Sequence, residues 1–444
     1  MFTRINLKNF RSFDIIDFDL TEKNNEAKNL AIVYGENGSG KSNLMSSFVL
    51  LAELINTMNV RDRYEELLNR TAIFTDEDIK RHIQQQLISD LRDMEAIIDD
   101  YRMVGCEEPI TVHYEFNIGG SNGVYHIEMG MHELLHERLE FKLNQRKGVY
   151  FDCNKESIYI NPSIVKDKDL LGDIKSTAKR YWGKHSLLAI VTHEIYDKSE
   201  AYGRENLSGN FSDVLYEFEL LSCNVGIGDR EWRDLNAPIQ MLQSPIAGKI
   251  SVNNEKQIDI VAKIFSKFFS SINSDIKEVV YKKVYNDKHI EYKLCIIRML
   301  ADSYRTIDFS KESKGNHQLL RLLCYLLTAC FGGIVVLDEA DSGIHDLLFK
   351  KIIQEICCCI DGQIIMTTHN TMLMESNINK GSIYIISEES GCHKFVRCIS
   401  DYDKRTYVGN NIRNKYLNNE YNGLPLVERI DFQELINYMA KEIQ

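Results

Sequence analysis

Residues 35–42, which read GENGSGKS, have the types and spacing of a loop that binds phosphate. They follow the apolar run at 30–34 and precede a helical pattern that begins near residue 43. In such a loop, consecutive backbone N–H groups and the N-terminus of the next helix point at one anionic group. A chance match in another kind of strand–turn–helix is disfavoured by this context. The complete pattern G-x-x-x-x-G-K-[ST] therefore predicts that the chain binds ATP or GTP.

Within this loop the two last residues have distinct predicted roles. The ammonium group of Lys41 is expected to reach the β- and γ-phosphates, and the hydroxyl of Ser42 to bind Mg²⁺. The other members of the predicted nucleotide site in this segment are Gly35, Glu36, Asn37, Gly38, Ser39, Gly40 and Asn43.

A second chemical segment lies about 300 residues further along. Residues 334–337 (IVVL) predict a parallel strand buried on both faces, and Asp338 and Glu339 follow it directly. Ligands bind at the carboxyl ends of strands in open α/β sheets. We therefore expect Asp338 to hold the Mg²⁺ shell and Glu339 to orient and deprotonate the attacking water. The plain alternative is an ordinary strand end.

A histidine follows the next predicted buried strand. The run at 363–367 ends in Thr367, and Thr368, His369 and Asn370 come after it. At that position His369 can reach the γ-phosphate, and we include it among the catalytic residues. Its alternative interpretation is a histidine at a strand end with no role.

The composition is that of an ordinary globular protein, with 444 residues, 44% hydrophobic and 27% charged. This length predicts one large domain with an insertion, or two domains. No apolar run approaches 18 residues and the first residues lack a signal-peptide core, so we expect a cytoplasmic protein without a membrane span. The net charge of −12 disfavours a protein that coats nucleic acid, although it does not exclude a local basic groove that binds it.

The eleven cysteines show no C-x-x-C spacing. Cys357, Cys358 and Cys359 fall in an apolar helical pattern, which predicts reduced thiols in the core rather than metal ligands.

Periodicity predicts the order of the remaining elements. Two strands are expected around residues 9–13, one on each side, and a hairpin at 110–129. Further strands are expected at 139–143, 148–159, 278–285, 290–299, 334–337 and 363–367. Helices are expected from 43 to about 102, including a charged helix at 76–100, and at 186–196, 213–223, 258–276, 317–330 and 346–359.

These motifs, in this order, resemble the ABC-type ATPase heads of the SMC/RecF group. The opening INLKNFRSF resembles the first strand of that group and places Arg11 near the nucleotide. SKESKGNHQ resembles a degenerate signature motif, with Ser313 and Gly315 at its key positions. LDEADSGIH supplies the Walker B segment and a D-loop that starts at Asp341, and Gln145 is the candidate for the glutamine that follows a strand after the phosphate loop.

A finer resemblance is to the OLD-like (overcoming-lysogenization) ATPases of bacterial phage defence, of the Septu, PARIS and abortive-infection type. It rests on DEADSGIHDLL, TTHNTMLME and the segment 412–425. About 75 residues follow His369, too few for a TOPRIM nuclease, so this resemblance implies a separate effector protein such as a nuclease.

The resemblance implies an α/β fold, an ABC-type P-loop ATPase head with a mixed sheet flanked by helices and a helical, short coiled-coil-like insertion. The expected parts are an N-terminal lobe at 1–60, a helical insertion at 61–108, antiparallel strands at 109–160, a helical lid at 161–277, a C-terminal lobe at 278–425 and a C-terminal helix at 426–444.

The same resemblance implies slow ATP hydrolysis with Mg²⁺, in a homodimer or higher oligomer that sandwiches ATP between the phosphate loop and the partner's signature serine. The trigger would be a phage protein or a nucleic acid. The alternative is a RecF-like DNA-repair ATPase that binds DNA directly; a transporter subunit and a purely structural nucleotide-gated switch are less favoured.

Overall fold

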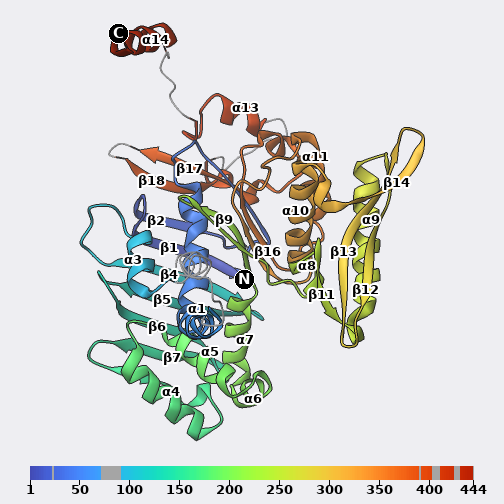
Figure 1. Ribbon diagram of the computed structural model, residues 1–444. Helices are drawn as coiled ribbons and strands as arrows, with labels where there is room; N and C mark the ends of the chain where they lie inside the picture. The colour runs from blue at the N-terminus through green and yellow to red at the C-terminus, as the bar shows by residue number, and fades with distance from the viewer. Residues whose placement is uncertain (23–24, 72–91, 390–391, 403–410, 425–430, 444) are drawn as a thin grey trace.

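Two seven-stranded sheets with a long helix between them form the body of the molecule, and a four-stranded sheet projects from one side (Figure 1). The computed structural model describes the chain except for residues 23–24, 72–91, 390–391, 403–410, 425–430 and 444. The predicted fold class, a mixed sheet flanked by helices around a phosphate loop, is confirmed.

The central sheet carries the two predicted chemical segments. Its strand order is β10-β9-β15-β16-β3-β17-β18, and the five inner strands run parallel. Its strands are β3 (Leu30–Tyr34), β9 (Leu221–Ile227), β10 (Arg230–Asp234), β15 (Ile334–Leu337), β16 (Gln363–Thr367), β17 (Ile383–Glu389) and β18 (His393–Cys398). Alternate side chains of β3 and β15 enter two different hydrophobic clusters, so the inner strands are buried on both faces.

The second sheet is antiparallel, with order β2-β1-β4-β5-β6-β7-β8. Its strands are β1 (Phe2–Phe10), β2 (Phe13–Asp19), β4 (Ile110–Ile118), β5 (Ser121–Met129), β6 (Leu134–Leu143), β7 (Arg146–Asn154) and β8 (Ile158–Ile160). Alternation of buried and partly exposed residues along β4 and β5 shows that one face covers the core while the other faces outward.

Helix α1 (Lys41–Thr71) begins within the phosphate loop and passes between the two sheets (Figure 1). Leu44, Phe48 and Leu51 on it are fully buried in the cluster shared by both sheets. The other helices on this side are α3 (Met94–Tyr101), α4 (Lys168–Tyr181), α5 (Leu187–Lys198), α6 (Glu200–Asn206) and α7 (Gly209–Glu219).

The other face of the central sheet is covered by α10 (Lys314–Cys330) and α11 (Asp346–Ile356). The projecting sheet, with β13 at its centre, packs on α9 (Glu255–Ile272). Its strands are β11 (Ala247–Ser251), β12 (Ile276–Tyr285), β13 (His289–Leu300) and β14 (Ser303–Asp308). The remaining helices are α8 (Gln240–Gln243), α12 (Ile399–Tyr402), α13 (Ile412–Leu417) and α14 (Phe432–Ile443).

Most predicted elements are confirmed, including the strands at 334–337 and 363–367 and the hairpin at 110–129. The helix predicted at 213–223 is wrong in its second half. Helical spacing of buried residues stops at Phe218. Residues 221–223 are then all buried at the start of β9, which pairs with β15, and burial alternates from Cys223 onward. The helix predicted at 258–276 likewise ends at Ile272, and Ile276 starts a strand.

Two other predictions have mixed outcomes. The charged helix at 76–100 falls largely on residues 72–91, outside the described residues; its end coincides with α3. The prediction that Cys357–Cys359 are core residues is wrong for Cys358 and Cys359, which are exposed beyond the end of α11 at Ile356, whereas Cys357 is partly buried against the core. All eleven cysteines lie in described segments and are free thiols.

Among the helices that the structure describes, none has the length and apolar character needed to cross a membrane.

Gln363 joins the N-terminus of the chain to the central sheet. Its Oε1 accepts from the backbone N–H of Phe2 (2.9 Å), and its Nε2 donates to the carbonyls of Phe2 (2.8 Å) and Lys28 (2.9 Å). Because Gln363 and Phe2 are fully buried, we expect Gln363→Leu to lower the free energy of unfolding by about 2–4 kcal/mol, measured by urea titration. Gln145→Leu, in the exposed β6–β7 turn, is the control; equal losses in both variants would contradict the interpretation.

Candidate functional site

The carboxyl ends of the parallel strands bring the two predicted segments together. β16 lies between β3 and β15, and all three run in the same direction. The phosphate loop follows β3, and Asp338 and Glu339 follow β15. Strand pairing therefore places residues some 300 positions apart at one edge of one sheet.

The phosphate loop has a backbone conformation that requires glycine at two of its positions. Gly38 and Gly40 have positive φ angles of 82° and 104°. A Cβ at Gly40 would lie 2.7 Å from the ring of Phe13, the first residue of β2. A side chain at this position would therefore be strained and would collide with the N-terminal hairpin.

Two hydrogen-bond donors of the loop, on Lys41 and Ser39, are suited to binding an anion. Lys41 is buried, and its ammonium group donates to the carbonyls of Gly35 and Glu36 at 2.9 Å each. These two bonds use two of its three N–H donors. The hydroxyl of Ser39 is buried and has no hydrogen-bond partner among the described residues. A phosphate held in the loop would satisfy such groups.

Burial lowers the pKa of Lys41, and the negative charges of Asp338, Glu339, Glu36 and Asp341 act in the opposite direction. Since Asp338 and Glu339 are the first two of these charges, the ammonium group of the loop and the carboxylates after β15 share one electrostatic environment.

Thr367, at the end of β16, fixes both carboxylate residues. Its hydroxyl donates to Oδ1 of Asp338 (2.6 Å) and accepts from the backbone N–H of Glu339 (2.8 Å). Thr367 is fully buried, whereas Glu339 is exposed and has a positive φ of 47°. A non-glycine residue in this conformation is strained, and such strain is common at functional sites.

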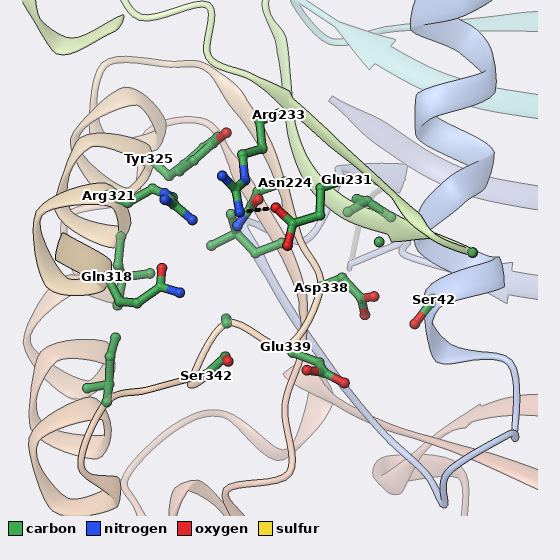
Figure 2. Close-up of a pocket in the computed structure, with 17 residues that line it drawn as sticks. Ser42, Asn224, Glu231, Arg233, Gln318, Arg321, Tyr325, Asp338, Glu339 and Ser342 are labelled. Atoms are coloured by element: carbon green, nitrogen blue, oxygen red, sulfur yellow. Dashed lines mark ion pairs between the residues drawn. The ribbon is translucent and has the colours of Figure 1, made fainter. Parts of the chain in front are cut away.

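Asp338 and Glu339, together with Ser42, line a cavity of about 330 Å³. Figure 2 shows the carboxylate of Asp338 between Glu339 and the hydroxyl of Ser42. The two residues predicted to share a magnesium ion therefore face the same space, and their oxygen atoms are the ligand type that Mg²⁺ prefers.

The opposite wall of the cavity comes from β9, β10 and α10. Figure 2 shows Gln318 and Arg321 of α10 across the cavity from Asp338, and an ion pair between Glu231 and Arg233 of β10. The backbone N–H of Asp338 also donates to the carbonyl of Asn224 (2.8 Å). Sequence reasoning missed this wall because β9 was predicted as the end of a helix.

Gln145 lies in the exposed turn between β6 and β7, in the antiparallel sheet, and is not among the residues that line the cavity. Its candidacy for a position in the nucleotide site is therefore wrong. The segment that borders the cavity after a strand is instead 224–233, because β9 and not β6 is the neighbour of β15.

Three predicted residues surround this site without lining the cavity. Ser313 is exposed and caps α10 by accepting from the N–H of Asn316 (3.3 Å). A Cβ at Gly315 would lie 3.3 Å from the carbonyl of Gly343, which brings the signature-like segment against the D-loop that begins at Asp341. His369 is exposed after β16.

Arg11 lies in the β1–β2 turn, half-buried, with its guanidinium 4.9 Å from the ring centre of Tyr101. Burial lowers its pKa. Its Nε is buried and has no hydrogen-bond partner among the described residues. The structure therefore leaves one donor of Arg11 without a partner within the turn between β1 and β2.

Lys394 of β18 is a contact of the phosphate loop that sequence reasoning missed. Its ammonium group donates to the carbonyl of Gly38 (2.9 Å) and lies 6.0 Å from the centre of the Phe13 ring. The side chain is almost fully buried. No motif marks this lysine, because β18 reaches the loop only through the pairing of β18, β17 and β3.

We expect Thr367→Val to reduce nucleotide hydrolysis about 10- to 100-fold, because the group that orients Asp338 and Glu339 is lost. The measurement is phosphate release at saturating nucleotide. Thr328→Val is the control, since Thr328 is also buried and donates to a backbone carbonyl, that of Cys324, away from the cavity. Unchanged turnover in Thr367→Val would refute the positioning role.

We expect Lys394→Met to weaken nucleotide binding about tenfold, the effect of one lost hydrogen bond from a charged group that holds the loop. Calorimetric titration with a non-hydrolysable analogue is the measurement. Arg397→Met, which removes a charge from the same strand, should bind normally because Arg397 pairs with Glu389. Equal affinity of both variants would show that Lys394 does not hold the loop.

Comparison with known proteins gives matches at low identity and two family matches. No curated protein matches the chain. The head of an SMC protein bound to the C-winged helix domain of ScpA is 14% identical, with a TM-score of 0.43 and coverage of 91% of this chain and 99% of that chain. The SMC head domain from Thermotoga maritima is 15% identical, with a TM-score of 0.38 and coverage of 89% and 98%.

The first family match, described as "AAA domain", covers residues 4–52, which include the phosphate loop. The second covers residues 30–375, most of the chain and both walls of the cavity. The chain therefore belongs to the nucleotide-binding AAA-domain family described as "AAA domain, putative AbiEii toxin, Type IV TA system".

Proposed function

We propose that this protein binds ATP with Mg²⁺ and hydrolyses it slowly. The observation that carries the proposal is the shared cavity of Ser42, Asp338 and Glu339, with the buried ammonium group of Lys41 in the same electrostatic environment. A phosphate-binding loop, a pair of metal-binding oxygens and a carboxylate next to them are the parts that phosphoryl transfer to water needs.

Each residue of the site has a separate role in the proposed hydrolysis. Lys41 and the loop N–H groups would hold the β- and γ-phosphates, and Ser42 and Asp338 would hold Mg²⁺, which when bound neutralises phosphate charge. Glu339 orients a water molecule and accepts its proton. Thr367 keeps Asp338 and Glu339 in register, since its hydroxyl contacts both residues. His369, exposed beyond β16, approaches the γ-phosphate.

We further propose that two copies of the chain close over ATP. Ser313 at the exposed N-terminus of α10 and the adjacent D-loop would complete the site of a second subunit. The N-terminus of a helix favours an anion, so the γ-phosphate would link the two subunits. ATP would then shift the population toward the closed dimer, because it binds that state more tightly.

The biological role that we propose is control of a separate effector, such as a nuclease, in bacterial defence against phage. The family description, which names an abortive-infection toxin, supports this role. A RecF-like repair ATPase is the rival, and it predicts DNA-stimulated hydrolysis with steep salt dependence. The net charge of −12 favours the first role.

Glu339→Gln should stop hydrolysis and leave ATP bound, because the amide cannot accept a proton from water while the rest of the site is intact. Light scattering after size exclusion should then show a larger fraction of dimer with ATP than in the parent protein, and phosphate release should fall at least about 100-fold.

Lys41→Ala is the matched comparison for this variant. It should lose nucleotide binding in calorimetry and remain unresponsive to ATP in light scattering, because the group that holds the phosphates is gone. Undiminished turnover in Glu339→Gln, or retained binding in Lys41→Ala, would contradict the roles given to these residues.

A further inference from the structure

The outward face of the antiparallel sheet carries a row of histidines and carboxylates that the nucleotide site does not use. Strand register places His113 of β4 opposite His126 of β5, and Glu128 of β5 opposite His136 of β6. These side chains are partly exposed, while their neighbours in the chain are buried against α1 and the core. The sheet therefore positions the row rigidly at its surface.

Three members of this row converge on one point. His126, Glu128 and His136 each offer one ligand atom, and these atoms all lie within 4.8 Å of one another. Nε2 of His126 is 3.3 Å from Oε1 of Glu128. Ligand atoms around a tetrahedral zinc ion are about 3.4 Å apart, given bonds of about 2.0–2.1 Å. Small side-chain rotations would bring all three to that spacing.

A fourth residue orients one of these ligands. Nε2 of His136 lies 2.7 Å from Oδ1 of Asp152 on β7. In the tautomer that donates Nε2–H to this carboxylate, Nδ1 of His136 keeps its lone pair for a metal. Asp152 is itself held by an ion pair with Arg138. A carboxylate behind a ligating histidine is the usual support of such ligands.

The histidines favour a metal over a simple ion pair. The rings of His126 and His136 are 5.3 Å apart, so two imidazolium cations would repel each other there. A metal ion bound between the two rings avoids this repulsion, because each ring then offers a lone pair to the metal instead of carrying a second proton.

We propose that His126, Glu128 and His136 bind a zinc ion at the β5–β6 surface. Two imidazoles and a carboxylate suit Zn²⁺, whereas Mg²⁺ and Ca²⁺ prefer sites made of oxygen alone. Three protein ligands leave a fourth position for water or for a side chain of a partner protein. The site lies in a different sheet from the phosphate loop, so the zinc proposal does not depend on whether the protein is an ATPase.

The test is calorimetric titration of the full chain with ZnCl₂ after treatment with a chelator. The background carries Cys358→Ser and Cys359→Ser, because these exposed thiols are an alternative zinc site. In this background we expect one zinc ion per chain. His126→Ala with His136→Ala should lower the affinity at least about 100-fold, and Glu128→Gln, which keeps the side-chain shape, about 10- to 100-fold.

His132→Ala is the matched control. His132 forms a comparable pair with Glu95 (2.8 Å), so the variant removes a histidine–carboxylate contact outside the triad and should bind zinc normally. Binding of Co²⁺ to the same proteins adds a spectrum, in which imidazole and carboxylate ligands give no thiolate charge-transfer band. Zinc binding that survives in both the His126/His136 and Glu128 variants, or no zinc binding at all in the serine background, would overturn the proposal.

Discussion

The site depends on the parallel pairing of β3, β16 and β15. These three strands are buried on both faces, and their backbone hydrogen bonds set the relative height of the segments that follow them. Alternate side chains of β3 and β15 enter two differently packed clusters, so a slip of one residue would exchange them between clusters and disrupt the packing on both faces. The positions of Lys41, Thr367 and Asp338 follow from this register.

Contacts from the N-terminal hairpin and from β18 hold the phosphate loop on this framework. Phe13 occupies the space that a side chain at Gly40 would need, and Lys394 binds the carbonyl of Gly38. Gln363 links β16 to the start of β1 through two buried hydrogen bonds with Phe2, and a third bond joins it to the carbonyl of Lys28, just before β3. The two sheets are thus connected at both ends of the strands that carry the chemistry, which favours a preorganised loop.

The strained backbone at Glu339 fits this arrangement. The residue keeps a positive φ while its N–H donates to Thr367 and the next N–H, of Ala340, donates to the carbonyl of Thr367. Two hydrogen bonds from one neighbouring strand end can stabilise a conformation that costs about 1–3 kcal/mol. The exposed carboxylate is therefore held in place by its backbone rather than by side-chain contacts.

The antiparallel sheet has a different relation to function. Its inner face completes the core around α1, and its outer face displays His126, Glu128 and His136 on neighbouring strands. Because these side chains lie on the solvated face of the sheet, they belong to neither hydrophobic cluster of the core.

Local spacing and runs of apolar residues are sufficient to predict the phosphate loop, the strand before Asp338 and the order of most helices and strands. The sequence did not identify β9. Its apolar residues directly follow a helix and continue the apolar pattern of that helix, and only their pairing with β15 makes them a strand. It also could not reveal Thr367 as the link between Asp338 and Glu339, or Lys394 as a loop contact. Those roles arise between residues that are distant in the chain, and only the tertiary structure decides which of them meet.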